Sequence, residues 1–499
     1  MTPTKERNKR FPKILCTLLV FVAFMCFFSA RWFVSVYGRI GFDSIIFTLT
    51  ASLGGVQSGL IIQYLLKALL PCLVCTAAVT LLLIVQPWNK RSRYQASHHR
   101  RLPLVIPVAL SIGLVVFAAF DVQLVDYLIN QKTDSEIYDV YYADPDETNI
   151  TFPEEKRNLI YIMLESMETS YLSEDLGGAL EENLIPELYE LAADNTCFSD
   201  SDLEVGGYYT TAGATWTIGS MVAQTAGIPL KTPTEDVNQY GKSGEAFLPG
   251  VTSLTDILDE AGYNQALMVG SDASFGGREA YFSQHGMDEI YDVYTARTDD
   301  IIPDDYFVWW GMEDQHLFEY AKQKLTEMAA EEEPFAFTML TVDTHHIGGY
   351  QCELCEESDS GESYDQSISC SSEQVAEFVE WIEDQDFYED TTIVIVGDHE
   401  SMDNGYFQRN VDDDYQRLVY NCFINADAEA ENTTNRDYAA VDLFPTTLAA
   451  MGCEIEGDRL GLGTNLFSDT PTLAETMGIY GFNAELAKAS EYYEENFYE

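Results

Sequence analysis

Basic residues are scarce in this sequence, and the scarcity is uneven. The 499 residues contain 27 Lys and Arg against 82 Asp and Glu, a formal net charge of -55 at pH 7. Residues 1–101 hold 13 of the basic residues and only two acidic ones, which leaves 14 basic and 80 acidic residues for the rest. A surface of that charge repels other polyanions, so we expect no nucleic acid partner. We interpret the acidity as a solvated surface.

Internal repeats and the composition of a disordered chain are also lacking. Hydrophobic residues make up 46% and aromatic residues 13% of the chain, enough for a buried core. Three long apolar runs lie in the first quarter, at Ile14–Ala30, Ala68–Val85 and Leu102–Phe120. Each is close to the roughly 20 residues that cross a bilayer as a helix. Because the first run lacks a small-residue cleavage site, we expect an uncleaved helix rather than a signal peptide.

The charges beside these runs predict their orientation. The N-terminal residues and the loop NKRSRYQASHHRR between the second and third runs are basic, so both should remain cytoplasmic. The segment Ile45–Gln63 is apolar but rich in Gly, Ser and Thr, and we expect an ordered external loop there. Three spans then place everything after about Asp121 outside. We therefore predict a multi-pass protein of the cell membrane, with a membrane domain at 1–124, a linker at 125–157 and an extracytoplasmic domain at 158–499.

Apolar strands alternate with amphipathic helices from Asn158 onward. Clear strand candidates are residues 159–164, 266–269, 335–340 and 392–397, and helices fit between them, for example at 314–331 and 373–384. Near-continuous apolar strands joined by helices indicate a buried, mostly parallel sheet that is sandwiched by helices. The predicted fold class is therefore an α/β domain that follows N-terminal transmembrane helices.

The cysteines of the external part favour disulfides. Six of the ten cysteines lie there, at positions 197, 352, 355, 370, 422 and 453. An even set in an oxidising compartment makes disulfides plausible, and Cys352 or Cys355 with Cys370 would close a short loop. Zinc at the C-x-x-C pair is the weaker alternative, because no second pair lies nearby.

Acid–base and metal-ligand residue types follow three of the predicted strands. In a parallel α/β sheet, function gathers at the carboxyl ends of the strands. The residues found there are Glu165 after the first strand, Asp343, His345 and His346 after the third, and Asp398 and His399 after the fourth. Any one of them alone is usually a capping carboxylate or a satisfied histidine. Together they predict a site for a divalent cation, with carboxylate oxygens and an imidazole as ligands.

A nucleophile is the remaining requirement, and the segment 206–230 offers several hydroxyls. A loop that leads into a helix places a hydroxyl at the helix N-terminus, where free amide groups favour a bound phosphate. A cation lowers the pKa of such a hydroxyl and makes it a nucleophile. The alternative is that these Ser and Thr residues only cap the helix.

Several of these segments resemble one known family. NLIYIMLES, GATWTIGSMVAQTAGIPL, LTVDTHH, IVGDHE and the N-terminal FDSIIFTLTASLGG are similar to the phosphoglycerol transferases of the alkaline phosphatase/sulfatase superfamily. The likeness is greatest to the membrane phosphoglycerol transferases that decorate periplasmic glucans, and lipoteichoic acid synthases are more distant. The resemblance covers nearly the whole chain and implies an alkaline-phosphatase-like sheet.

The resemblance also implies a metal site and a nucleophile. Members of the family bind Mn²⁺ or Mg²⁺, and the matching ligands here are Glu165, Asp398, His399 and the nucleophilic threonine, with Mn²⁺ preferred. Thr217 matches the T-x-x-S spacing and is placed first as the nucleophile. Thr215, in GAT, matches the position used in lipoteichoic acid synthases and is the alternative.

Substrate-binding residues follow from the same motifs. His345 matches the histidine at the substrate phosphate, with His346 beside it, and Arg278 matches an arginine that contacts the glycerophosphate. Trp310, in a segment similar to WG-x-x-D, is expected to line the pocket. The tryptophan of the family's SFWNR-like motif is replaced by Gly276, and Val269 stands near the position of a second family histidine.

The implied activity is transfer of phosphoglycerol from phosphatidylglycerol, with release of diacylglycerol, through an intermediate on the threonine. The acceptor is expected to be an extracytoplasmic glycan or glycolipid hydroxyl. The alternatives are a phosphoethanolamine transferase, a sulfatase or phosphodiesterase on the same scaffold, and a non-catalytic envelope-binding protein. The C/S-x-P-x-R context of sulfatases is absent around Thr217.

Overall fold

The computed structural model describes residues 4–39, 41–50, 58–85, 102–231, 246–287, 289–356 and 360–498. The chain forms two compact units. Unit 1 comprises Met1–Phe42 and Leu53–Ile129, and unit 2 comprises Asp43–Ser52 and Asn130–Glu499. The predicted basic loop between the second and third apolar runs, at 89–101, lies outside the described residues.

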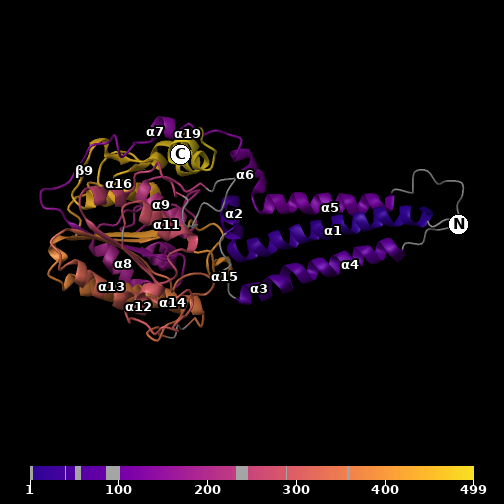
Figure 1. Cartoon of the computed structure of the whole chain (residues 1–499), viewed down its shortest axis with the longest axis horizontal. Coiled ribbons are helices and arrows are strands. Elements are labelled where there is room, and N and C mark those ends of the chain that lie inside the picture. Colours follow the sequence, from indigo (N-terminus) through magenta and orange to yellow (C-terminus); the bar gives the residue numbers. More distant parts are fainter. Residues whose placement is uncertain are drawn as a thin grey trace. The chain divides into compact units, whose positions relative to one another are not determined.

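Unit 1 is built from long apolar helices. Helix α1 (Thr4–Tyr37) packs along α5 (Leu102–Asp121) and along a second long helix, which consists of α3 (Ser58–Tyr64), a π-helical turn (Leu65–Leu69) and α4 (Leu70–Val85) (Figure 1). Two segments, Ile14–Tyr37 and Gly59–Leu83, are long and apolar enough to cross a membrane, with mean hydropathies of 2.2 and 2.1. Val105–Asp121 reaches that length only together with α6 (Leu124–Asn130), from which it is bent by 66°.

The second span begins earlier than the sequence indicates. It starts at Gly59 rather than at Ala68, so the expectation of a loop up to Gln63 is wrong for its last residues. Lys67 interrupts the apolar run, yet the helix continues through it, because a lysine stem is long and apolar. Within unit 1, Trp32 Nε1 donates to Gln63 Oε1 at 3.0 Å, which satisfies that polar side chain inside the helix pair. Residues 42–50 form helix α2 (Phe42–Thr50) rather than a loop.

Unit 2 is built on a seven-stranded sheet of order β3-β8-β7-β2-β6-β4-β5. The strands are β2 (Asn158–Leu164), β3 (Gly207–Tyr208), β4 (Asn264–Val269), β5 (Glu289–Tyr291), β6 (Phe335–Leu340), β7 (Thr391–Gly397) and β8 (Val419–Ile424). Strands β7, β2, β6, β4 and β5 run parallel, whereas β8 pairs antiparallel with β7, and β3 pairs antiparallel with β8. The four predicted strands and the mostly parallel sheet are confirmed.

Helices cover both faces of this sheet (Figure 1). One face packs against α9 (Thr217–Ala226), α10 (Leu254–Glu260), α11 (Arg278–Gln284) and α16 (Leu443–Ala450), and the other against α8 (Pro186–Asp194), α12 (Val293–Thr298), α13 (Asp314–Met328) and α14 (Ser363–Glu383). Along β2, residues 159, 161 and 163 belong to one core cluster and residues 160, 162 and 164 to the other. Both faces of the strand are therefore buried, which explains its continuous apolar sequence.

The remaining elements border the sheet. Residues 130–157 contain α7 (Ile137–Tyr141) and β1 (Ile150–Thr151), and β1 pairs antiparallel with β9 (Glu454–Ile455). Strands β10 (Arg459–Leu460) and β11 (Gly463–Thr464) form a small hairpin. Helices α15 (Asn404–Asn410), α17 (Leu473–Met477), α18 (Ile479–Leu486) and α19 (Glu491–Phe497) complete unit 2.

Candidate active site

Three ligand-type side chains converge where the central strands end. Glu165 follows β2, and Asp398 and His399 follow the neighbouring strand β7. One ligand atom from each of the three lies within 4.8 Å of the others. His399 Nε2 lies 3.3 Å from Asp398 Oδ2 and 3.9 Å from Glu165 Oε1. All three residues are almost fully buried.

The hydrogen bonds of this cluster use some of its ligand atoms and leave others available to bind an ion. The backbone N–H groups of Ser166 and His399 both donate to Asp398 Oδ1 at 2.7 Å. Asp398 Oδ2 is buried and accepts no hydrogen bond from any described residue. His399 Nδ1 donates to the carbonyl oxygen of Glu400 at 2.8 Å, so Nε2 is the ring nitrogen that faces the two carboxylates.

The buried carboxylates of the cluster favour a bound cation. Burial raises the pKa of Asp398 to about 7, and the nearby Glu165 carboxylate adds to the rise. Burial opposes a charge on His399 as well, but Asp398 and Glu165 outweigh it and raise the pKa of the imidazole. Two buried carboxylates and an imidazole Nε2 match the ligands of a divalent metal ion, and backbone hydrogen bonds hold Asp398 and His399 in place. The residues therefore fit a divalent metal ion.

Helix α9 begins at Thr217 and is hydrogen-bonded to the end of β7. Thr217 is the first residue of the helix, and Ser220 donates from its Oγ to the carbonyl oxygen of Asp398. Gln224, one turn further, donates to the carbonyl oxygen of Gly397 at 3.1 Å. Because residues three and seven apart share one helix face, the face that carries Thr217 is turned toward the cluster.

Thr215, the alternative nucleophile, has a different environment. It precedes the helix, and its Oγ1 forms a hydrogen bond of 2.9 Å with Ser44 Oγ of helix α2. Residues 43–52 belong to unit 2, so this contact lies within one unit. The structure thus engages the Thr215 hydroxyl with another hydroxyl, a contact that the sequence did not indicate.

His345 and His346 follow β6, the strand on the other side of β2. His345 Nδ1 donates to the carbonyl oxygen of His346 at 2.7 Å, which leaves Nε2 of the neutral ring as a proton acceptor. Burial, with a smaller contribution from the neighbouring His399, lowers the pKa of His345 to about 4, although the hydrogen bond to His346 opposes the shift. Burial lowers the pKa of His346 as well. Both imidazoles are therefore neutral at pH 7.

Arg278 begins α11 and is held by the loop that precedes it. Its Nε donates to the carbonyl oxygen of Phe275 at 3.0 Å, and Nη2 donates to Ser271 Oγ at 2.9 Å and to the carbonyl oxygen of Asp272 at 2.7 Å. Nη1 takes part in none of the hydrogen bonds among the described residues. Burial lowers the pKa of Arg278 to about 10, and the carboxylates of Glu165 and Asp398 counteract this effect. The guanidinium therefore stays charged and keeps one free N–H corner.

The segment WWGMEDQ divides into two roles. The ring of Trp310 lies 4.7 Å from the ring of His345 and 5.5 Å from that of Phe275, at the rim of the site. Asp314 instead accepts the backbone N–H groups of Val342 and Asp343, at 2.7 and 3.1 Å. Asp314 thus fixes the end of β6 and has a structural position.

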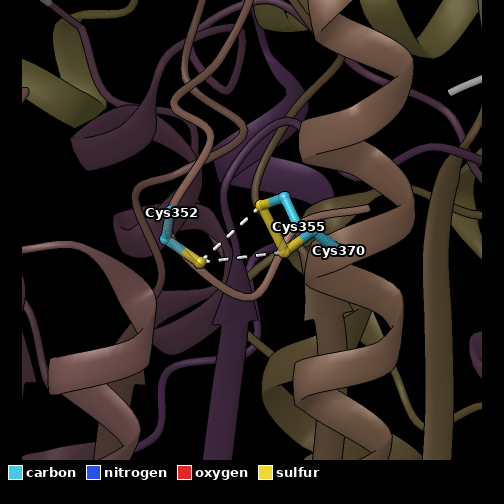
Figure 2. A group of neighbouring side chains, drawn as sticks. All are labelled: Cys352, Cys355 and Cys370. Carbon is cyan, nitrogen blue, oxygen red and sulfur yellow. Dashed lines mark hydrogen bonds between the residues drawn. A yellow bond between two sulfur atoms is a disulfide. The ribbon is translucent and has the colours of Figure 1, made fainter. Parts of the chain in front are cut away.

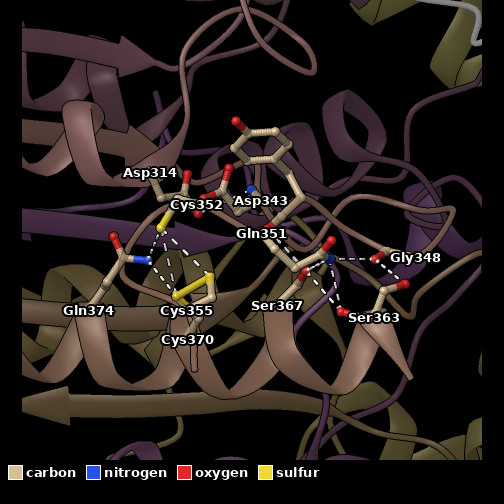
Figure 3. Close-up of a disulfide and its surroundings, with 11 residues drawn as sticks. Asp314, Asp343, Gly348, Gln351, Cys352, Cys355, Ser363, Ser367, Cys370 and Gln374 are labelled. Atoms are coloured by element: carbon tan, nitrogen blue, oxygen red, sulfur yellow. Dashed lines mark hydrogen bonds between the residues drawn. A yellow bond between two sulfur atoms is a disulfide. The ribbon is translucent and has the colours of Figure 1, made fainter. Parts of the chain in front are cut away.

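A second cluster of ligand-type residues consists of three cysteines (Figure 2). Cys355 and Cys370 form a disulfide that ties the loop after β6 to α14. Cys352 Sγ lies 3.6 Å from the sulfur of Cys355 and 3.8 Å from that of Cys370. Asp314 and Asp343 lie beside this group (Figure 3). Of the two predicted pairings with Cys370, the structure forms the one with Cys355.

Comparison with known proteins gives consistent results. The sulfatase family model matches residues 157–453. The chain is 30% identical over 435 residues to phosphoglycerol transferase I of Salmonella choleraesuis (strain SC-B67), covering 85% of this chain and 53% of the relative. It is equally similar to phosphoglycerol transferase I of Salmonella typhi. The chain thus spans about half the length of these curated relatives.

A solved structure is similar to both parts of the chain. Lipooligosaccharide phosphoethanolamine transferase A of Neisseria meningitidis, an integral membrane protein, matches with a TM-score of 0.51 and 13% identity. The match covers 89% of this chain and 84% of that protein. At this identity, the likeness shows a shared fold.

Proposed function

Because this chain belongs to the sulfatase family, we propose that it is a membrane-bound, metal-dependent phosphoglycerol transferase. The observation that carries the proposal is the buried group of Glu165, Asp398 and His399 beside the N-terminus of α9. The relatives named phosphoglycerol transferase I give the proposed group to be transferred. The donor is phosphatidylglycerol, and the acceptor is a hydroxyl of an extracytoplasmic glycan or glycolipid.

Glu165, Asp398 and His399, together with the Thr217 hydroxyl, would hold one divalent cation, Mn²⁺ in preference to Mg²⁺. The bound cation neutralises phosphate charge and lowers the pKa of a coordinated hydroxyl. The fold orients the Asp398 carboxylate for the cation, because two backbone N–H groups hold Oδ1 while Oδ2 remains available as a ligand.

Thr217 is the proposed nucleophile. Its Oγ1 attacks the phosphorus of the donor, a new oxygen–phosphorus bond forms, and the bond to the diacylglycerol oxygen breaks. The hydroxyl proton of Thr217 is given up, and the released diacylglycerol oxygen takes up one proton, so the step balances. The acceptor hydroxyl then displaces the phosphoglycerol group from Thr217 and restores the threonine hydroxyl. The free backbone N–H groups in the first turn of α9 favour the phosphate oxygens throughout. The hydrogen bond of Thr215 to Ser44 supports Thr217 as the nucleophile.

His345 and Arg278 assist this exchange. The bare Nε2 of His345 can accept the proton of the acceptor hydroxyl as that oxygen attacks phosphorus. The unengaged Nη1 of Arg278 can bind a phosphate or glycerol oxygen, while its other nitrogens keep the group in place. His346 and Trp310 line the same rim and are proposed to contact the substrate.

A lipid donor explains why the enzyme carries membrane helices. We propose that unit 2 is extracytoplasmic, because the basic N-terminal residues and the basic loop should remain on the cytoplasmic side. We also propose three spans, with α5 as the third. The catalytic domain then lies on the side of the membrane that carries the glycan acceptor.

The test is diacylglycerol release from labelled phosphatidylglycerol by the full-length protein in detergent with Mn²⁺. We expect Thr217→Ala to lower the rate by roughly 10³-fold or more, because the nucleophile is removed. Thr215→Ala, the matched control, should remain within about tenfold of the wild type. Equal rates for the wild type and Thr217→Ala would refute the mechanism. Faster turnover of phosphatidylethanolamine than of phosphatidylglycerol would reassign the donor.

A further inference from the structure

Two adjacent tryptophans form the tip of a tight turn beside the candidate site. The N–H of Val308 donates to the carbonyl oxygen of Gly311 at 2.9 Å, and the N–H of Gly311 donates to that of Val308 at 2.7 Å, so Trp309 and Trp310 are the two turn residues. Trp309 has a φ of 51°, in the left-handed region. Such turns usually contain Gly, Asn or Asp, and a bulky residue there is strained. The conformation of the turn therefore does not explain why tryptophans occupy its two central positions.

The turn is fixed at the sheet end that carries the site. Gly311 forms a β-bridge with Ser271, and the N–H of Met312 donates to the carbonyl oxygen of Gly270 at 2.8 Å, directly after β4. A Cβ at Gly311 would collide with the same Gly270 carbonyl oxygen, so the turn and the strand end are in close contact. The two indoles are thus held at a defined position.

Half-buried aromatic rings extend from His345 along this turn. Trp310 lies against His345, and the ring of Trp309 lies 6.3 Å from that of Tyr350, with 33° between the ring planes. Phe307, before the turn, is 57% exposed. Neither core cluster of unit 2 contains any of these four aromatic residues. The rings therefore offer apolar faces at the surface rather than filling the core.

Buried polar atoms without partners occur in the turn, just after it and in the loop that ends at Tyr350. Trp309 Nε1, Glu313 Oε2 and both carboxylate oxygens of Asp343 have no hydrogen-bond partner among the described residues. Asp343 is 2% and Glu313 6% exposed. Burial raises the pKa of Tyr350, and the charges of Glu313 and Asp343 add to the rise. The N–H of Tyr350 donates to the carbonyl oxygen of Asp343 at 2.7 Å, which places the two residues side by side. Unpaired buried polar groups are costly and are normally satisfied by a ligand or water.

A sugar ring has the chemistry to meet all of these groups. Its C–H faces are apolar and flat enough to lie on an aromatic ring, and each hydroxyl at its rim can both donate and accept a hydrogen bond. Hydroxyl donors suit the oxygens of Asp343 and Glu313, and a hydroxyl oxygen suits the indole N–H. An anionic ligand is disfavoured, because the chain after residue 101 has 80 acidic against 14 basic residues.

We propose that Trp309, Tyr350, Glu313 and Asp343 form an acceptor subsite that holds one uncharged sugar ring, with a hydroxyl directed toward His345. The proposal rests on the transferase function proposed above and names the residues that select its acceptor. Asp343 precedes His345 by two residues, and Trp310, which adjoins Trp309 in the turn, has its ring 4.7 Å from that of His345, so the subsite adjoins the reacting groups.

The experiment measures phosphoglycerol transfer by the full-length enzyme in detergent with Mn²⁺, with a neutral gluco-oligosaccharide of about four to six sugars as the acceptor. We expect Trp309→Leu and Asp343→Asn each to raise the KM for the oligosaccharide about tenfold, while kcat stays within about threefold, since a tenfold change corresponds to one lost contact of ordinary strength. Trp309→Phe, which keeps a ring but lacks the N–H, should fall between Trp309→Leu and the wild type. Tyr480→Leu, at a ring that is 81% exposed on α18, is the control and should leave the KM unchanged.

Direct binding separates this inference from the proposed function. Titration calorimetry with the same oligosaccharide should show binding by the wild type and about tenfold weaker binding by Trp309→Leu. Diacylglycerol release without an acceptor tests the transferase function independently. If that release occurs but folded Trp309→Leu and Asp343→Asn bind the oligosaccharide as the wild type does, the subsite is wrong and the function stands. Tighter binding of a glycerophosphate oligomer than of the oligosaccharide would also overturn it.

Discussion

Replacing the three clustered cysteines one at a time tests how the loop after β6 is tied to α14. In the chain-entropy description, the Cys355–Cys370 disulfide, which closes a separation of 15 residues, stabilises the fold by about 3 kcal/mol. Cys370→Ser removes that link. The remaining pair, Cys352 and Cys355, is only three residues apart. A disulfide between these two residues would stabilise the fold by about 1.6 kcal/mol and would not link the loop to α14. We therefore expect a loss of about 1.5 to 3 kcal/mol for Cys370→Ser.

Cys355→Ser should behave differently, because Cys352 can replace the lost partner. Its sulfur lies 3.8 Å from that of Cys370, at a separation of 18 residues, and the new disulfide would contribute about 3.2 kcal/mol. With an unfolding entropy of about 2.1 cal/mol/K per residue over the roughly 380 residues of unit 2, a loss of 3 kcal/mol lowers Tm by about 4 °C. We expect a shift of about 2 to 4 °C for Cys370→Ser and less than about 1 °C for Cys355→Ser.

The assay is thermal unfolding of the full-length protein, purified without reductant and followed by circular dichroism. Peptide mapping of Cys355→Ser should identify a Cys352–Cys370 disulfide. Cys352→Ser, which keeps the native link, is the matched control and should retain the wild-type Tm. The reasoning is refuted if Cys355→Ser loses as much stability as Cys370→Ser, because Cys352 would then not act as a substitute.

Two further substitutions test the metal cluster and the strand end that carries it. Asp398→Asn should reduce bound Mn²⁺ from about one per chain to a small fraction in elemental analysis of the purified protein, because a ligand charge is lost; Asp412→Asn, at an exposed position, should keep it. Gly397→Ala places a Cβ against the carbonyl oxygen of Met167 and should cost about 1 to 3 kcal/mol in denaturant unfolding. Gly405→Ala meets only ordinary contacts and should remain near the wild type; equal effects of both alanines would contradict the argument.

The sequence was most informative where strands are buried on both faces. Strand β2 and its parallel neighbours are uninterrupted apolar runs, so their positions and the sheet end that carries Glu165 and Asp398 could be predicted. Strand β8 could not, because Asn421 interrupts its pattern; that side chain is buried and bonds both the N–H and the carbonyl oxygen of Phe198, each at 2.9 Å. Lys67 hid the true start of the second span for the same reason, since a single polar residue breaks an apolar run without breaking the helix.

Local sequence patterns could not predict interactions between segments that are distant in the chain. The hydrogen bond between Ser44 and Thr215 joins residues 171 positions apart, and no local spacing indicates it. The unpaired oxygens of Asp343 and the indole N–H of Trp309 are properties of burial that emerge only once the chain is folded. The WG-x-x-D resemblance drew attention to Trp310, whereas Trp309 has no counterpart in the motif, although its strained turn places it at the rim.

The segment that follows β6 connects the metal cluster, the proposed acceptor subsite and the disulfide. Thr341 Oγ1 accepts the N–H of Glu165 at 3.0 Å, and Thr344 Oγ1 donates to the Glu165 carbonyl oxygen, so the start of the segment holds a proposed metal ligand. The N–H of Tyr350 donates to the carbonyl oxygen of Asp343 at 2.7 Å, which closes the loop that carries both histidines. Cys352 follows two residues later beside the disulfide. Breaking the disulfide should therefore disturb the positions of Tyr350 and the proposed acceptor subsite more than that of Glu165, because the intervening hydrogen bonds anchor the segment at its start.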